Sequence, residues 1–237
     1  GHADVRRMLA SMKAEIFSAR AIGLACAMAI DMANATGNAD WQARAALLTP
    51  IAKAYGTDVG VNVASLGVQL HGGMGFIEET GAAQFLRDAR ITPIYEGTNG
   101  IQAMDLVARK MMDGGEAAFR LIGEIEAAAK AARDTLPDLA EDVWGAAETL
   151  REATEALIAR DLTDRFAGAV PYLRAFALVL GAHYHLTAAR AEGADGPRSR
   201  LARIAIKRLL PRHVALLAEA AEGAADLYAL SPEDLAA

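Results

Sequence analysis

The stretch that decides how this chain folds is Leu70–Gln102, LHGGMGFIEETGAAQFLRDARITPIYEGTNGIQ. A glycine cluster at residues 71–75, HGGMG, ends a long helical pattern. Further on, residues 94–102, IYEGTNGIQ, place one carboxylate, Glu96, between an apolar strip and the start of another helix. No Lys or Arg lies within four residues of Glu96. This is the only part of the chain whose residues indicate chemistry rather than packing.

Two local features support that interpretation. Thr98 or Asn99 can cap the following helix, so Glu96 would lie just before a helix N-terminus, where the dipole favours negative charge. The glycines of the cluster allow positive φ and a close approach of the backbone to a ligand. A glycine-rich loop is common, however, and by itself predicts only a turn.

Upstream of this stretch, apolar residues recur at three- and four-residue steps, which predicts two long helices at about 4–35 and 40–70. Pro50 interrupts the second pattern, which is compatible either with a kink or with a helix start at Thr49-Pro50. A short helix follows at 82–90, with Phe85 and Leu86 turned inward, and a fourth runs from about 101 to 111. Short connections favour antiparallel neighbours, so the sequence predicts a four-helix up-and-down bundle.

Beyond Gly115 the composition shifts to Ala, Glu and Arg, with one-sided apolar stripes. These stripes predict a second helical bundle, in which Asp138 can cap one helix and Pro211 kinks a last helix over about 198–228. We therefore expect an all-α protein with one helical domain at 3–114 and an additional helical bundle domain at 115–237.

Composition narrows the function classes. The chain has 237 residues, 53% hydrophobic and only 5% aromatic, which suits helices better than sheets. A net charge of −6 argues against nucleic acid as a partner. The one cysteine, Cys26, lies in an apolar stripe and is expected in the core, which fits a reducing, cytoplasmic compartment. No apolar run approaches the roughly 20 residues that span a bilayer, so no membrane association is predicted.

Metal binding is not predicted either. His183 and His185 stand two residues apart, which on a helix places them on different faces and makes them poor joint ligands.

Three blocks together resemble the acyl-CoA dehydrogenase family: residues 69–76 (QLHGGMGF), 85–90 (FLRDAR) and 94–102 (IYEGTNGIQ). The resemblance covers about half the chain, from near Asp4 to Met111. Three ordered blocks at family-like spacing are specific where one alone would be weak. The sequence after Met111 looks like the extra helical domain of the longer bacterial members, on position and helical pattern.

The resemblance implies an activity. Glu96 would be the base that removes the α-proton of an acyl-CoA thioester, acting from an apolar pocket, while the β-hydride leaves to FAD. The Glu96 N–H is similar in position to the family donor that bonds the thioester carbonyl. Tyr95 and Gly97 would line the acyl-CoA site.

The resemblance also implies cofactor contacts. The residues concerned are Gln69, Leu70, His71, Gly72 and Gly73, against the FAD of a neighbouring subunit, and Thr98, Asn99 and Gly100, against the FAD of their own subunit. Family members often carry a larger polar residue where this chain has Gly100. A shared cradle implies a homo-oligomer, dimer or tetramer, and the reaction implies an electron-accepting flavoprotein as partner.

By this resemblance, the family's N-terminal helical domain and β-domain are absent from the chain. We therefore expect the chain alone to be inactive and to hold FAD weakly or not at all. Two other hypotheses remain open: a flavoprotein of the same fold with a binding or stress-response role, and a helical oligomerisation module. Thioester dehydrogenation by the full-length parent would separate the first hypothesis from these two.

Overall fold

The computed structural model describes residues 1–236, and these contain helices and turns but no strand, which confirms the all-α prediction. The α-helices are α1 (Ala3–Thr36), α2 (Ala39–Leu70), α3 (Gly73–Phe76), α4 (Ala82–Arg90), α5 (Asn99–Val107), α6 (Glu116–Ala132), α7 (Pro137–Ile158), α8 (Leu162–Ala167), α9 (Ala169–Glu192), α10 (Pro197–Ile204), α11 (Arg212–Ala221), α12 (Ala225–Ala229) and α13 (Pro232–Ala236). Short 3₁₀ turns cover Glu78–Thr80 and Arg109–Met111, and a π-helical turn covers Ala205–Leu209.

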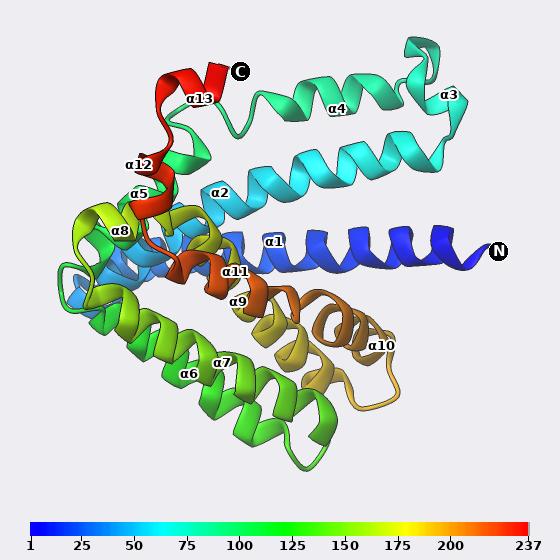
Figure 1. The fold of residues 1–237 in the computed structure, drawn as a ribbon. Helices are drawn as coiled ribbons and strands as arrows, with labels where there is room; N and C mark the ends of the chain where they lie inside the picture. The colour runs from blue at the N-terminus through cyan, green and yellow to red at the C-terminus, as the bar shows by residue number, and fades with distance from the viewer. Residues whose placement is uncertain (237) are drawn as a thin grey trace.

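The first two helices form the predicted antiparallel pair. Gly37 ends α1 in the left-handed conformation, with φ 65°, and its N–H donates to the Ala33 carbonyl. The side chain of Asn38 then caps α2 by accepting from the Asp40 N–H at 2.7 Å. Pro50 lies buried inside α2, so the helix continues through it. Figure 1 shows α1, α2 and α4 running side by side at one end of the molecule.

Helix α9 lies at the centre of the second half and joins it to the first. It packs against α1, α2 and α5 as well as α6, α7, α10 and α11. Gly181 of α9 meets Ser18 of α1 so closely that a Cβ at Gly181 would lie 2.8 Å from the Ser18 Cβ. One continuous hydrophobic core therefore runs from Ile22 and Leu48 through Leu106 to Phe176 and Leu217.

A buried histidine forms a second contact between the first and second halves of the protein, between α9 and α1. The His185 ring of α9 stacks on Phe17, with centroids 4.4 Å apart, and its Nε2 donates to the Ala14 carbonyl of α1 at 3.1 Å. Burial lowers the pKa of His185 to about 4, although the bond to Ala14 opposes this. Burial likewise lowers the pKa of His183 to about 4. Both rings are therefore neutral near pH 7.

Two local expectations were wrong, and a third was right only in part. Phe85 is 74% exposed, because α4 packs only on α2 and the neighbouring turns and leaves that side open, whereas Leu86 is half-buried. Asp138 does not cap α7, whose first turn is set by Pro137; it accepts from Arg203 instead. The last expected helix is interrupted at Pro211, as expected, because proline has no N–H to donate. It is also divided further: a π turn precedes Pro211, in which the Leu210 N–H bonds the Ala205 carbonyl, and α12 is separate from α11.

Cys26 is buried in the core as expected, with its Sγ 3.6 Å from the Thr49 hydroxyl. Helix α1 is the one helix of residues 1–236 that is long and apolar enough to cross a membrane, with a mean hydropathy of 1.6 in its most apolar window. It also buries Ala14, Ile22 and Ala29 completely against its neighbours, which is the behaviour of a bundle helix.

Candidate active-site turn

The segment that carries Glu96 is a closed turn of residues 93–99, here called the Glu96 turn, which joins α4 to α5. The Asn99 N–H donates to the Pro93 carbonyl at 3.1 Å and brings the two ends of the turn together. Glu96 lies at its tip with φ 56°, the one positive φ at a non-glycine residue among those described, and Gly97 follows with φ 83°. A left-handed conformation costs a residue with a Cβ about 1–2 kcal/mol, so the rest of the structure must hold it.

Helix α5 begins directly after this tip. The Thr98 hydroxyl accepts from the Ile101 N–H at 3.4 Å, so Thr98, rather than Asn99, is the cap. Glu96 accordingly lies just before a helix N-terminus, as the sequence predicts. The hydrogen bonds described for residues 1–236 leave the Glu96 N–H without an acceptor.

The carboxylate of Glu96 is open to solvent. Its side chain is 69% exposed, and the Nζ of Lys53, on α2, stands 3.5 Å from its Oε2. The expected apolar pocket is not formed by residues 1–236, because no helix of the chain covers the tip of the turn. Ile94 and Tyr95 are about half exposed beside the carboxylate and provide an apolar rim. A contact of this length between two exposed groups contributes at most about 0.5 kcal/mol.

Asn99 holds the turn to α2 through its side chain. The amide Nδ2 lies 3.1 Å from the Ala54 carbonyl, 2.9 Å from the Thr57 hydroxyl and 2.8 Å from Asp58 Oδ1. The amide oxygen accepts from Thr57 at 3.0 Å. The Asn99 side chain is therefore fully engaged within the protein, and any cofactor contact there falls to its backbone.

The second predicted cofactor segment, residues 69–73, lies at the far end of α2. The His71 Nδ1 donates to the Gly67 carbonyl at 2.8 Å, which fixes the ring across the helix end. Gly72 has φ 60°, with open space where a Cβ would stand. His71 is 14 residues beyond Thr57, which corresponds to about 21 Å along the helix. The structure thus brings Tyr95–Gly100 together with α2 but keeps Gln69–Gly73 apart from them.

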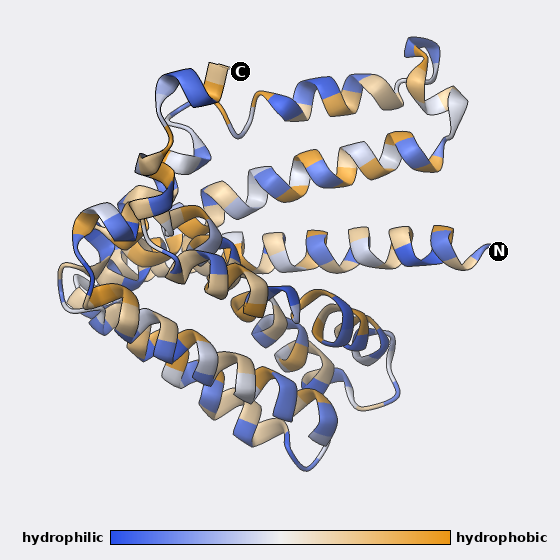
Figure 2. Ribbon diagram, in the orientation of Figure 1, coloured by the Kyte–Doolittle hydropathy of each residue, from blue (hydrophilic) through white to orange (hydrophobic). Residues whose placement is uncertain are grey.

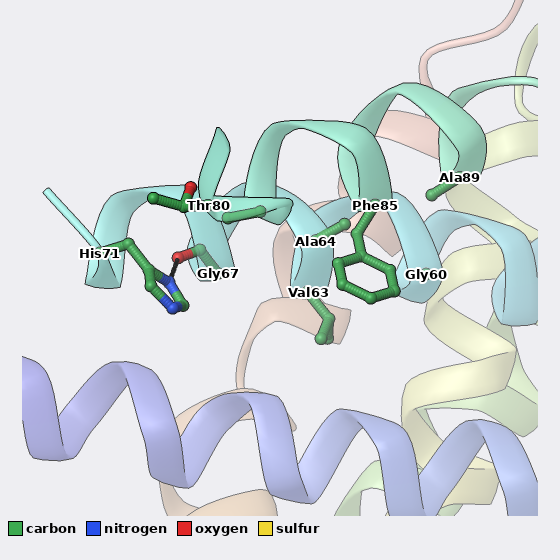
Figure 3. Close-up of a pocket in the computed structure, with 9 residues that line it drawn as sticks. Gly60, Val63, Ala64, Gly67, His71, Thr80, Phe85 and Ala89 are labelled. Atoms are coloured by element: carbon green, nitrogen blue, oxygen red, sulfur yellow. Dashed lines mark hydrogen bonds between the residues drawn. The ribbon is translucent and has the colours of Figure 1, made fainter. Parts of the chain in front are cut away.

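Two cavities flank these segments. A cavity of about 400 Å³ lies between α2 and α4, where Figure 3 shows Phe85 of α4 opposite Val63 and Gly60 of α2. His71 and Thr80 close it at one end.

A larger cavity, of about 710 Å³, opens at the foot of the Glu96 turn. Thr98, Asn99 and Gly100 line it. Its charged residues are Glu15, Asp58, Arg90, Arg174 and Arg212. Burial raises the pKa of the Glu15 carboxyl, and Arg212 at 3.5 Å opposes that rise.

Sequence reasoning did not identify Lys53, Asp58, Arg90 and Arg174 as neighbours of the site. Lys53, Asp58 and Arg174 lie far from the motif in sequence, and Arg90 is the last residue of the short helix α4. No pattern in the chain distinguishes them from ordinary surface charges. Among the residues that the structure describes, no group of three or more His, Cys, Asp or Glu side chains is arranged to hold a metal ion.

Comparison with known proteins agrees with these observations. Residues 1–112 match the family described as acyl-CoA dehydrogenase, C-terminal domain, and residues 121–231 match acetyl-CoA dehydrogenase C-terminal like. The chain is 45% identical to 3-methylmercaptopropionyl-CoA dehydrogenase of Ruegeria pomeroyi over 73% of its length and 31% of the relative's. It is 34% identical to the broad-specificity linear acyl-CoA dehydrogenase FadE5 of Mycobacterium tuberculosis over 69% of its length and 26% of that protein's.

A solved structure shares the fold. The crystal structure of Caenorhabditis elegans ACDH-11 in complex with C11-CoA superposes with a TM-score of 0.72 at 23% identity, covering 86% of this chain and 36% of that one. The chain thus spans about a third or less of the two curated relatives named above. It belongs to the acyl-CoA dehydrogenase family and carries that family's C-terminal helical domain followed by the C-terminal-like extra domain.

Proposed function

We propose that this chain supplies the proton-abstracting base, Glu96, to an FAD-dependent enzyme that dehydrogenates acyl-CoA thioesters. The observation that carries this proposal is the geometry of Glu96. A glutamate is kept in a left-handed conformation at the tip of a closed turn, directly before a helix. Its carboxylate is exposed, and its N–H has no acceptor among residues 1–236. Strain of this kind is typical of functional positions.

The reaction assigns two roles to one residue. The Glu96 carboxylate takes the α-proton as the α C–H bond breaks, and the electron pair moves toward the thioester carbonyl. The Glu96 N–H donates to that carbonyl oxygen and stabilises the charge that develops there. Tyr95 and Gly97 line the acyl chain's path, and an acyl chain over Ile94 and Tyr95 would exclude water from the carboxylate.

The residues present fit an FAD dinucleotide in part. Gly72 and Gly73 leave open space at the end of α2, and the larger cavity joins Thr98 and Gly100 to Arg90, which suits a pyrophosphate. Bound FAD would accept the hydride from the β-carbon, so that the product is a trans-2-enoyl thioester. About 21 Å along α2 separates Thr57, which bonds Asn99, from His71. This separation supports the view that residues 69–73 and 98–100 contact FAD molecules of different subunits.

Exposed apolar surface supports the view that the parent is larger and oligomeric. Met74, Phe76, Phe85, Ile91 and Ile101 are all more than half exposed. Figure 2 shows hydrophobic residues along α2 and α4, at the end of the molecule away from α6 and α7. We propose that the rest of the parent and a second copy cover this surface in a cytoplasmic dimer or tetramer. An electron-accepting flavoprotein would then reoxidise the cofactor.

The test is Glu96→Gln in the full-length parent, with Glu79→Gln as the control, because Glu79 is an exposed glutamate away from the turn. Glu96→Gln should retain flavin but lower the rate of flavin reduction by acyl-CoA by more than the roughly 10²–10⁴ typical of a general base. The control should stay near wild type. Reduction within tenfold of wild type for Glu96→Gln would refute the assignment.

The cofactor proposal has its own test. Titration of the 237-residue chain with FAD, followed by flavin fluorescence, should give binding too weak to saturate at micromolar concentration, because half of each cradle lies on another part of the assembly. Stoichiometric submicromolar binding would contradict the shared-cradle argument.

A further inference from the structure

A hydrogen-bonded chain connects the Glu96 turn to the second half of the protein. Its first link is Asn99, three residues after Glu96, whose N–H closes the turn on Pro93 and whose amide reaches α2. These bonds fix the end of the turn and, through it, the left-handed tip.

The second link is Asp58 of α2, which uses both carboxylate oxygens. Oδ1 accepts from the Asn99 amide at 2.8 Å, and Oδ2 accepts from Arg174 Nε at 3.0 Å. The Arg174 guanidinium also brings a second nitrogen to Oδ2 at 3.0 Å. Asp58 is 22% exposed and Arg174 49% exposed, so the bridge is only partly screened by water.

The third link is α9 itself. Arg174 lies in the second turn of α9, whose neighbours Leu173 and Ala175 are buried in the shared core, and α9 packs directly on α5. Arg174 is therefore presented from a rigid helix rather than from a loop. Because Arg174 fixes the Asp58 carboxylate, it also fixes the acceptor toward which the Asn99 amide is turned.

We propose that Asp58 and Arg174 are positioning residues for Glu96, through which the extra C-terminal domain holds the active-site turn in its productive conformation. The inference rests on the proposed function for the role of Glu96. The juxtaposition of Arg174, Asp58 and Asn99 is a property of the chain in any case. Without Arg174, Asp58 can rotate toward solvent, and the turn keeps only its bonds to Ala54 and Thr57.

The first test is structural and uses the 237-residue chain. The N–H groups of Asn99, Ile101 and Gln102 all bond within the turn or its cap, so their hydrogen-exchange rates measured by NMR report its opening. Arg174→Ala should speed their exchange about three- to tenfold. The matched control is Arg203→Ala, because Arg203 pairs with Asp138 at 2.6 Å, is 55% exposed and lies on α10.

Two outcomes of this test overturn the proposal: exchange within twofold of wild type in Arg174→Ala, or an equal increase in Arg203→Ala. A second variant pair tests the route. In an Asp58→Ala background, Arg174→Ala should have no further effect on these three N–H groups, because the link is already broken. Additive effects would show that Arg174 acts by another path, against the proposal.

The second test measures catalysis in the full-length parent. Arg174→Ala, assayed at saturating FAD because Arg174 also lines the larger cavity, should lower kcat about tenfold with KM within twofold, because the substrate still binds but the base is displaced. Arg174→Lys should recover part of the loss. Glu96→Gln, measured in parallel, separates the two ideas. If it stays active, the proposed function fails; if it is inactive while Arg174→Ala matches wild type, the positioning role fails.

Discussion

Replacing Glu96 with glycine should leave the 237-residue chain about as stable as the unsubstituted chain, or slightly more stable. Glu96 has φ 56°, and glycine adopts that conformation without the cost of about 1–2 kcal/mol that a Cβ imposes. Against this gain stands the larger entropy of glycine in the unfolded chain, about 0.5–1 kcal/mol. The exposed contact with Lys53 contributes at most about 0.5 kcal/mol. The balance lies between about −0.5 and +1.5 kcal/mol, centred on about 0.5 kcal/mol in favour of Glu96→Gly.

The matched control is Glu222→Gly. Glu222 is exposed, lies at the end of α11 with φ −68° and has no strain to release, so its replacement should cost about 0.5–1 kcal/mol. Since the glycine entropy enters both variants equally, their difference of about 0.5–2 kcal/mol reports the backbone strain at Glu96 less the small Lys53 contact.

The assay is urea unfolding at pH 7, followed by far-UV circular dichroism and by the fluorescence of Trp41 and Trp144, with the slope of each transition compared. Glu96→Gln should lie slightly below wild type, because it keeps the strain and loses the charge. If Glu96→Gly is as destabilising as Glu222→Gly, the strain does not exist and the structural support for a functional Glu96 is lost.

Two further predictions concern the contacts between the halves. Gly181→Ala should lower the free energy of unfolding by about 1–3 kcal/mol, because the new Cβ would lie 2.8 Å from the Cβ of Ser18. Adding Ser18→Gly should recover much of this loss. Additive losses of the two variants in urea unfolding would contradict the clash. Burial holds His183 and His185 neutral, with pKa values of about 4, below the 6.5 of the unfolded chain. The stability that they contribute is therefore complete above pH 6.5 and is lost as the pH falls toward 4. This loss is up to about 3 kcal/mol for each histidine. Urea unfolding at pH 7 and pH 4.5 should show this loss of free energy of unfolding, and a chain carrying His183→Phe and His185→Gln should lose less. An equal loss in both chains would refute the view that His183 and His185 are buried in the neutral form.

Local sequence determined the helices and the position of the turn. The cap at Asn38, the stop at Gly37 and the cap at Thr98 depend on side chains and glycines within four residues of the backbone groups they satisfy. The same holds for the placement of Glu96 before α5. The family resemblance of residues 69–76 and 94–102 could be recognised from the sequence because its residues are consecutive.

Tertiary structure decided what surrounds the carboxylate. Lys53, Asp58 and Arg174 lie 43, 38 and 78 residues from Glu96 in sequence, too far for any local pattern to show that they reach the Glu96 turn. Each of these residues looks like an ordinary surface charge in its own helix, and only the packing of α2 and α9 around the turn brings it to the site.

The exposure of side chains was also decided by packing between helices. Phe85 has the hydrophobicity of a core residue, yet α4 has a neighbour on one side only, so its ring stays 74% exposed. Glu96 stays open for the same reason. Periodicity tells which residues share a helix face, but whether that face is covered depends on elements that are distant in sequence. The chemistry of the turn was therefore set by consecutive residues, and its support by the tertiary contacts of α2 and α9.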